Sequence, residues 1–282
     1  TNATGIAGNR GYFMLGKLLS LASIAVVGAA LAIAPAQARS LDQIIQSGTI
    51  KIGVNPNFPP MSSYGDTNEF QGFDIDVGNK IAEALGVKAE FVPTETAQRV
   101  PFIVADQIDI SLGALTRSAE RAKLIDFTVP LHTESMAVLT TDKTAATKWT
   151  ELDTDTVTLV NMRGNWSVDF LKEKLPKSKV LLVESNADTV RAIAQGRADA
   201  LVENVDFFMA FTKNYPDVKW KTLNDTIFTN YDCIGVSKGN EGLRSFLNTL
   251  LYDLHSSEYI NTAWTKWYGT PMLKPVVPNP FF

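Results

Sequence analysis

The pattern of apolar and polar residues along the chain predicts an α/β protein. "TIKIGV" at 49–54 alternates and then breaks at "NPNFPP", which predicts a strand followed by a turn-rich loop. Over 72–86 apolar residues recur at helical spacing and Gly86 provides a C-terminal stop, so we expect a helix there. "KAEFVPT" returns to a strand pattern. Strand, helix and strand in this order are typical of an α/β sheet.

The same alternation continues along the rest of the chain. We expect further strands in "IDISLGA", "MAVLTT" (136–141), "TVTLVN" (156–161), "KVLLVE" and "ADALVEN". We expect helices in "RVPFIVADQ", "SVDFLKEKL", "NADTVRAIAQG", "VDFFMAFTKNY" and a long amphipathic tail from "GLRSF" to "TKWYG". Two α/β units of similar plan, without a flexible linker between them, predict two lobes. In such folds small ligands sit in clefts at the carboxyl ends of strands.

The N-terminal residues differ in kind from the rest. Arg10 and Lys17 precede the uncharged run "LLSLASIAVVGAALAIA", which ends at Pro35 and is followed by "AQA" at 36–38. A basic flank, an apolar stretch and a small-x-small site are the parts of a secretory signal, so we expect 1–38 to be a cleavable signal peptide. The alternative is an N-terminal membrane anchor, since the run approaches the roughly 18–20 residues that span a bilayer.

The composition argues against several classes of function. A net charge of −4 and a pI of about 5.3, with no Lys/Arg block, do not favour a nucleic-acid-binding protein. Cys233 is the only cysteine, so no intramolecular disulfide can form. His132 and His255 are the only histidines, and the sequence contains no zinc-type His/Cys cluster, Ser/His/Asp arrangement or phosphate-cradling glycine loop. We therefore expect no metal, no cofactor and no catalytic residues.

Four segments together carry a resemblance to a known family: "GFDIDVGNKIAEALG", "TRSAERAKLIDFTVP", "AIAQGRADAL" and "WTKWYG". Their order and spacing resemble those of the periplasmic solute-binding proteins for polar amino acids, bacterial family 3, over essentially all of 41–270. The resemblance implies an α/β, two-lobed periplasmic binding protein type II fold with a ligand cleft between the lobes. Lobe 1 would comprise 41–134 and 231–282, and lobe 2, 135–230, would be inserted between them. It also implies a monomeric periplasmic protein that captures an amino acid and delivers it to an inner-membrane ABC permease.

The resemblance places a carboxylate-binding site around "GALTRSAERAKLIDF". Arg121, six residues before the Phe of "IDF", corresponds to the family's carboxylate-binding arginine, and a guanidinium fork matches a carboxylate. Without the resemblance, Arg121 would be a surface arginine paired with Asp126 or Glu120. Phe58 corresponds to an aromatic that packs on the ligand side chain; alternatively it is a core aromatic. The resemblance also implies backbone N–H and hydroxyl donors to the carboxylate at Gly113, Ala114 and Thr116, and backbone amides that meet it from lobe 2 at Gly164, Asn165 and Trp166.

Two positions depart from the family's pattern. Binders of α-amino acids often carry aspartates there that hold the ligand ammonium, whereas this sequence has Asn55 and Asn204. An unpaired ammonium in a closed cleft would be costly. Glu203 is adjacent, and a shift of one residue would bring it into the site; otherwise it pairs elsewhere. The other candidate acids are Asp74, Asp206 and Asp232.

Arginines near the expected cleft favour a more negative ligand. "TAQRVPFI" resembles a segment of acidic-amino-acid binders, which puts Arg99 near the cleft, and Arg117 and Arg163 flank the carboxylate-binding segments. Each of them alone is more often a solvated side chain. Together with the two missing aspartates, they favour glutamate, aspartate or a carboxylate without an α-amino group.

Two other classes of function stay open. The same fold hosts cyclohexadienyl dehydratases, which eliminate water from prephenate or arogenate with a glutamate acid. Aligned on "GRADA", the position of that glutamate holds Phe207, with Asp206 beside it, so an enzyme is the minority alternative. A sensor module would need a separate partner protein. For a binding protein we expect the lobes to close over the ligand, with Tyr231 and Asp232 as hinge candidates, because hinges sit at element ends.

Overall fold

The structure, a computed structural model, describes residues 38–204 and 211–278. The predicted signal peptide therefore lies outside the described residues apart from Ala38, and so do Asp206 and Phe207. Within the described part, no helix is both long and apolar enough to cross a bilayer.

The first α/β unit of the chain is built around β1 (Thr49–Val54). This strand pairs in parallel with β5 (Lys88–Pro93) and with β6 (Ile110–Ser111). The helix α2 (Phe73–Leu85) ends at Gly86, whose φ of 69° lies in the left-handed region that suits glycine. The other elements of this unit are α1 (Leu41–Ser47), β2 (Asn57–Phe58), β3 (Ser62–Tyr64), β4 (Phe70–Gln71), η1 (Thr96–Gln98), α3 (Arg99–Val104) and α4 (Ala119–Ala122).

The second α/β unit follows the long strand β7 (Ile125–Thr141). In it β8 (Thr158–Met162) pairs in parallel with β9 (Lys179–Val183) and with β10 (Ala200–Asn204). Its own buried core includes Leu159, Leu171 and Val202. The other elements among the described residues from here onward are η2 (Trp149–Leu152), α5 (Ser167–Lys174), α6 (Asn186–Ala194), β11 (Trp220–Ser237), α8 (Glu241–Ser256) and α9 (Tyr259–Tyr268).

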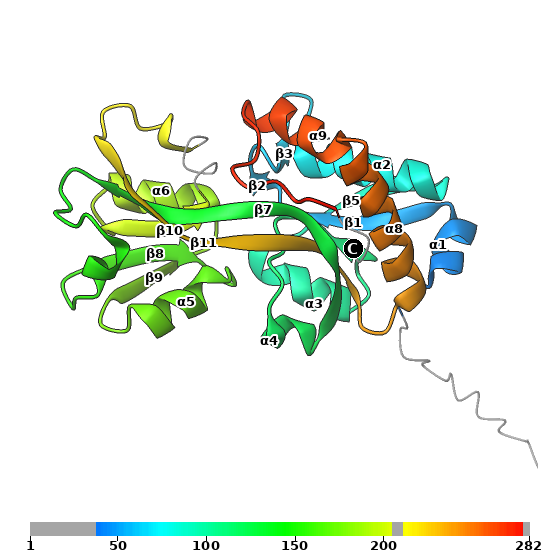
Figure 1. Ribbon diagram of the computed structural model, residues 1–282, viewed down its shortest axis with the longest axis horizontal. Helices are drawn as coiled ribbons and strands as arrows, with labels where there is room; N and C mark the ends of the chain where they lie inside the picture. Colours follow the sequence, from blue (N-terminus) through cyan, green and yellow to red (C-terminus); the bar gives the residue numbers. More distant parts are fainter. Residues whose placement is uncertain (1–37, 205–210, 279–282) are drawn as a thin grey trace, which may run out of the picture. The chain divides into compact units, whose positions relative to one another are not determined.

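The strands β7 and β11 join both units into one sheet. The strand order is β5-β1-β6-β11-β7-β10-β8-β9, and β7 and β11 run side by side and antiparallel at its centre (Figure 1). In their register Asn230 lies opposite Glu134, and Thr229 lies opposite Ser135. The lobe boundaries predicted at 134/135 and 230/231 thus lie at the same level of the sheet. The predicted α/β, two-lobed type II fold is confirmed.

Several elements differ from the sequence-based prediction. The strand expected at 136–141 is only the end of the 17-residue β7, and the pattern does not predict the 18-residue β11. Both strands carry polar residues that become buried only where the strands pair. The expected helical tail is two helices, because Glu258 adopts a left-handed φ of 60° between α8 and α9. The helix expected in "VDFFMAFTKNY" falls largely on residues 205–210, outside the described residues.

The hinge candidates Tyr231 and Asp232 lie inside β11 rather than at the end of an element. The pairing of β11 with β7 shifts register between Asp232 and Cys233 and again between Cys233 and Gly235. Such a bulge leaves a local gap in the ladder of hydrogen bonds and bends the strand. The irregularity nearest to the predicted hinge is therefore a bulge within a continuous strand.

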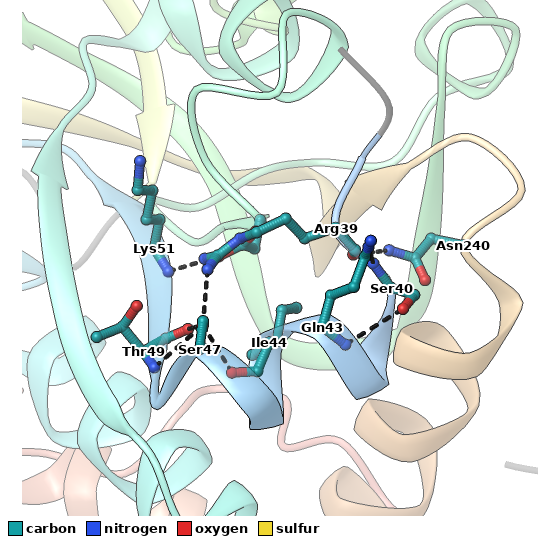
Figure 2. A network of polar contacts seen from close by, with 9 residues as sticks. Arg39, Ser40, Gln43, Ile44, Ser47, Thr49, Lys51 and Asn240 are labelled. Atoms are coloured by element: carbon teal, nitrogen blue, oxygen red, sulfur yellow. Dashed lines mark hydrogen bonds and ion pairs between the residues drawn. The ribbon is translucent and has the colours of Figure 1, made fainter. Parts of the chain in front are cut away.

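Arg39 fixes the start of the described chain to the first unit. Its Nε donates to Oδ1 of Asp109 at 2.8 Å, and its Nη1 donates to Oγ of Ser47 at 2.9 Å (Figure 2). The backbone N–H of Lys51 donates to the other oxygen of the same carboxylate at 2.6 Å. Asn240 donates from Nδ2 to the carbonyl of Arg39 at 2.9 Å (Figure 2). The first residue expected after signal cleavage is thus held by the folded protein.

Candidate ligand-binding site

A cavity lies where the two units meet the shared strands. The first unit, the second unit and the strands β7 and β11 all contribute side chains to its lining. From the first unit these are Phe58, Thr96, Arg99, Ala114 and Thr116; from the second unit Met162, Asn165, Trp166 and Glu203; from the shared strands Glu134, Met136 and Asn230. Seven of the twelve residues predicted as ligand contacts line this cavity: Phe58, Arg99, Ala114, Thr116, Asn165, Trp166 and Glu203.

The paired strands β7 and β11 form the floor of this cavity. Met136 and Glu134 lie two residues apart on β7, and Asn230 lies opposite Glu134 on β11. Because side chains two apart on a strand share a face, the next pair on this face is His132 and Asp232. These two side chains are buried, and His132 Nδ1 lies 3.7 Å from Oδ2 of Asp232. Beyond the cavity, the same face of the two strands therefore carries a buried polar pair, His132 and Asp232.

Two glutamates, Glu134 and Glu203, line the cavity, whereas Asn55 and Asn204, which the sequence analysis placed in the site, do not. Glu134 and Glu203 are 4% and 3% exposed. Asn204 donates from Nδ2 to Oε1 of Glu134 at 3.2 Å, and from its backbone N–H to Oε1 of Glu203 at 2.9 Å. Asn165 donates from Nδ2 to Oε2 of Glu203 at 2.9 Å. Asn204 and Asn165 therefore hold the two acids in place, and Glu203, adjacent to Asn204, lines the cavity.

Burial shifts the titration of the acids around the cavity. Desolvation raises the pKa of Glu203 to about 7, although the hydrogen bond from the Asn204 N–H opposes the shift. Desolvation also raises the pKa of Glu134 well above its ordinary value, and repulsion from Asp232 and Glu203 and a hydrogen bond with Asp232 add to it. Beside the cavity, burial raises the pKa of Asp74 to about 8, against a hydrogen bond of 2.8 Å from the Gly113 N–H. Several of these carboxyls therefore hold protons near neutral pH.

Arg99 supplies a fixed positive charge to the same cavity. Its Nε donates to the Thr96 carbonyl at 3.1 Å, and its Nη1 donates to the carbonyls of Ala114, at 2.7 Å, and Gly113. Its Nη2 has no hydrogen-bond partner among the described residues. Burial lowers its pKa to about 10, with Arg121 adding to the shift, so Arg99 stays cationic at neutral pH. The buried guanidinium is therefore oriented by three carbonyls and keeps one nitrogen for another partner.

Arg121 bridges the two units beside the cavity and does not line it. Its Nη1 donates to the Thr116 carbonyl at 2.7 Å, and its Nη2 donates to the Gly164 carbonyl at 3.0 Å. Neither surface pair that the sequence left open forms, because Asp126 pairs with Lys238 and Glu120 with Lys123. A neighbouring hollow is lined by Arg121 together with Thr96, Ala97, Val100, Leu115, Glu120, Leu124 and Gly164.

The other two arginines expected near the cleft point elsewhere. The guanidinium of Arg117 lies 5.6 Å from the ring centre of Tyr231 on an exposed side chain. Arg163 donates from Nε to Oε1 of Glu184 at 2.9 Å, and both side chains are more than half exposed. Neither arginine lines the cavity. The interpretation of a cleft rich in positive charge is therefore wrong as regards these two residues.

Two of the predicted contacts have their polar groups engaged within the protein. Asn55 is buried, donates from Nδ2 to Oγ1 of Thr96 at 3.1 Å and accepts from the Asn57 N–H at 3.0 Å. The Gly113 N–H, expected to face a ligand carboxylate, donates to Asp74. These groups shape the loop under the cavity and are occupied before any ligand enters.

Gly164, Asn165 and Trp166 occupy the turn before α5. Gly164 has a φ of 76°, and a Cβ there would lie 2.8 Å from Cα of Ala97, so only glycine fits this close approach. The Asn165 N–H, one of the amides expected to meet the ligand, donates to the Met162 carbonyl at 3.1 Å. The Trp166 ring lines the cavity and packs edge-on against Phe228 with ring centres 4.8 Å apart.

Sequence analysis misses five of the cavity residues. They are Thr96, Glu134, Met136, Met162 and Asn230. The one available signal is Glu134, a carboxylate in "LHTESMAVL" whose neighbours along the strand are all buried. A buried acid within a strand requires a partner or a function.

A two-lobed α/β fold with a charged cavity over strands shared by both lobes defines the class of extracellular solute-binding proteins. The model of bacterial extracellular solute-binding proteins, family 3, matches residues 50–270. The chain belongs to this family.

Individual relatives include both binding proteins and an enzyme. A probable amino-acid ABC transporter-binding protein of Haemophilus influenzae is 23% identical over 81% of this chain and 88% of its own length. A cyclohexadienyl dehydratase of Pseudomonas aeruginosa is 26% identical over 59% of this chain and 63% of its own. The crystal structure of an ancestral amino-acid-binding protein, a precursor of cyclohexadienyl dehydratase, superposes with a TM-score of 0.74 at 28% identity, covering 81% of this chain and 99% of that one. The relatives of this solute-binding protein thus include an amino-acid-binding protein of an ABC transporter as well as an enzyme.

Proposed function

We propose that this protein captures a polar α-amino acid in its cavity in the periplasm and delivers it to an ABC importer in the inner membrane. In this proposal 1–38 is removed as a signal peptide, and the protein acts as a monomer. Lobe 1 consists of 41–134 and 231–282, and lobe 2 is 135–230. Membership of the family and the place of the cavity between the two α/β units support this proposal.

The observation that carries the proposal is the separation of charge within one cavity. Arg99 is a buried cation with a nitrogen to spare, whereas Glu134 and Glu203 are buried acids in the same lining. An α-amino acid carries a carboxylate and an ammonium on one carbon atom, and opposite charges placed close together are what such a ligand requires. The exposed positions of Arg117 and Arg163 remove much of the argument for glutamate or aspartate.

In the ligand complex, Arg121 would exchange its carbonyl partners for the ligand carboxylate. Its guanidinium already bonds to Thr116 of one unit and Gly164 of the other. A carboxylate held there would replace neutral acceptors by a charged one, and charge-assisted bidentate bonds are about twice as strong. Contacts with both units are what allow a ligand to favour the closed form.

Native mass spectrometry of the purified protein, followed by a thermal-shift screen, tests the proposal. The screen uses the standard L-amino acids, dicarboxylates and prephenate. A co-purified amino acid, or a clear rise in melting temperature with one of them, is the expected result. Thr116→Val, which removes a cavity hydroxyl at constant shape, should weaken binding about 2- to 10-fold. The matched control is Thr265→Val at an exposed position on α9. Stabilisation by dicarboxylates alone would contradict the proposal.

A dehydratase is the second candidate function, because the cavity contains acids that hold protons near neutral pH. Glu134 or Glu203 could donate a proton to a leaving hydroxyl, as a general acid does. Residue 207, at the position of the family enzyme's glutamate, lies outside the described residues. Incubation with prephenate decides between the candidates: its disappearance, abolished by Glu134→Gln or Glu203→Gln, would identify an enzyme.

A further inference from the structure

Acidic groups outnumber basic groups in and beneath the cavity. Among the described residues, Glu134, Glu203, Asp232 and Asp74 are all buried there, against the arginines Arg99 and Arg121. Asp232 is only 1% exposed, and its oxygens have no hydrogen-bond donor among the described residues unless Glu134 carries a proton. A buried carboxylate without donors is costly, so this floor lacks a cation or a proton.

We propose that the cationic group of the ligand completes this cluster, next to Asp232, by displacing a proton from the buried carboxyls Glu134 and Glu203. Resting on the proposed function, this inference makes an ammonium or guanidinium group obligatory in the ligand and links its affinity to pH. The proton leaves for the solvent, and no covalent bond changes. The acids that hold the ligand ammonium then come from β7, β10 and β11 rather than from the positions of Asn55 and Asn204.

The empty cavity keeps a proton because its arginines cannot balance its acids. Glu134 and Asp232 share a hydrogen bond, and two carboxyls can do so only if one of them is protonated. Glu203 accepts hydrogen bonds from Asn165 and the Asn204 N–H, which favour its charged form, but burial outweighs them and raises its pKa to about 7. A ligand cation that enters beside these groups favours their charged forms and lowers their pKa. Binding of the ligand cation and release of the proton are therefore thermodynamically linked.

No other charged group among the described residues on the neighbouring elements takes the place of the ligand cation. His132 on β7 faces Asp232, but burial lowers its pKa, so it is neutral at pH 7. Arg99 on α3 is held by three carbonyls, and Arg121 on α4 is held by two. Asp74 on α2 adds a further acid, with one oxygen on the Gly113 N–H and the other without a partner among the described residues.

The direction of the pH effect follows from the sign of the proton exchange. Between the lowered pKa of the complex and the raised pKa of the free protein, binding releases a proton, so affinity rises with pH. The rise is about tenfold per pH unit for each proton released, and it ends above the pKa of the free acids, about 7 for Glu203. In the opposite case, an anionic ligand would take up a proton and lose affinity as pH rises.

Isothermal titration calorimetry in two buffers of different ionisation enthalpy counts the released protons. The probes are L-glutamine, L-arginine and L-glutamate, with L-2-hydroxyglutarate as the analogue of L-glutamate that lacks the ammonium group. At pH 6.5 we expect release of about half a proton to one proton with the bound amino acid, and none at pH 8.5. Glu134→Gln or Glu203→Gln should reduce the release, whereas Glu173→Gln, an exposed acid on α5, should leave it unchanged.

The outcomes separate this inference from the proposed function. Proton release that falls in the glutamine variants supports it. If an amino acid binds without proton release at pH 6.5, or the hydroxy acid binds as tightly as its amino acid, the inference is wrong and the proposed function stands. If no standard amino acid binds at all, the proposed function itself fails. If a variant does not fold, calorimetry of the unaltered protein in the two buffers still shows whether ligand binding releases a proton.

Discussion

Asn204 donates from Nδ2 to Oε1 of Glu134 across 3.2 Å and so connects the end of β10 to the centre of β7. At the position of Asn204, family members that bind α-amino acids often carry an aspartate. Here the amide acts on a different acid, which lines the cavity from the floor. The acid that Asn204 contacts therefore lies on β7, the strand paired with β10, and the amide orients it.

Asn204→Asp should destabilise the protein because it replaces this donor by a carboxylate. The change brings two acids together in a buried site and removes a hydrogen bond, which should cost about 1–3 kcal/mol at pH 7. Urea denaturation of the ligand-free protein measures the loss, with Asn214→Asp at an exposed position as the control. An unchanged stability of Asn204→Asp would mean that the contact with Glu134 is not made.

Arg121→Ala should weaken ligand binding strongly while the protein stays folded. Loss of a partly buried guanidinium that meets a carboxylate typically costs 2–5 kcal/mol, which is about 30-fold or more in affinity. Arg117→Ala, an exposed arginine of the same segment, is the matched control. Calorimetric titration gives both affinities. A loss of only a few-fold for Arg121→Ala would remove this arginine from the site.

Asp74→Asn should change how stability depends on pH. In the native protein this carboxyl has a pKa of about 8, raised from 3.8 by burial, so folding takes up a proton between those values. Stability should therefore fall by about 1.4 kcal/mol per pH unit from about pH 4 to pH 8 through this group alone. Asparagine mimics the protonated carboxyl, so the stability of the variant should lack this dependence on pH. The variant should therefore be more stable than the unaltered protein, with the largest difference at pH 8. Chemical denaturation at several pH values measures this. If the free energy of unfolding changed with pH equally in both proteins, the raised pKa of Asp74 would be contradicted.

Arg39→Ala should destabilise the first unit. Its partner Asp109 is a nearly buried carboxylate, whose side chain is 6% exposed, and would lose charge-assisted hydrogen bonds. We expect a cost of about 1–3 kcal/mol. The control is Arg163→Ala, whose ion pair with Glu184 is exposed and should be worth about 0–1 kcal/mol. Equal effects of the two changes in thermal denaturation would show that the buried contact adds nothing.

Local sequence determines the parallel α/β units of this protein. The alternation over 49–54 gives β1 at the same bounds, and the helical spacing before Gly86 gives α2 over Phe73–Leu85. Both signals are local, because they need only the period of the side chains and a residue that ends the element. The family resemblance adds Arg99, Thr116 and Trp166, all of which line the cavity.

Only the tertiary structure decides where the charges meet. The pairing of β7 with β11 is a contact between segments some hundred residues apart in the sequence, and it buries Glu134 and Asp232 on the same face. The raised pKa of Glu134 comes mainly from removal of water, which no local pattern encodes. The same holds for Arg117, which the sequence places beside the cleft and the fold turns towards Tyr231. The sequence specifies which side chains can carry a charge, whereas packing determines how deeply each is buried and which group it pairs with.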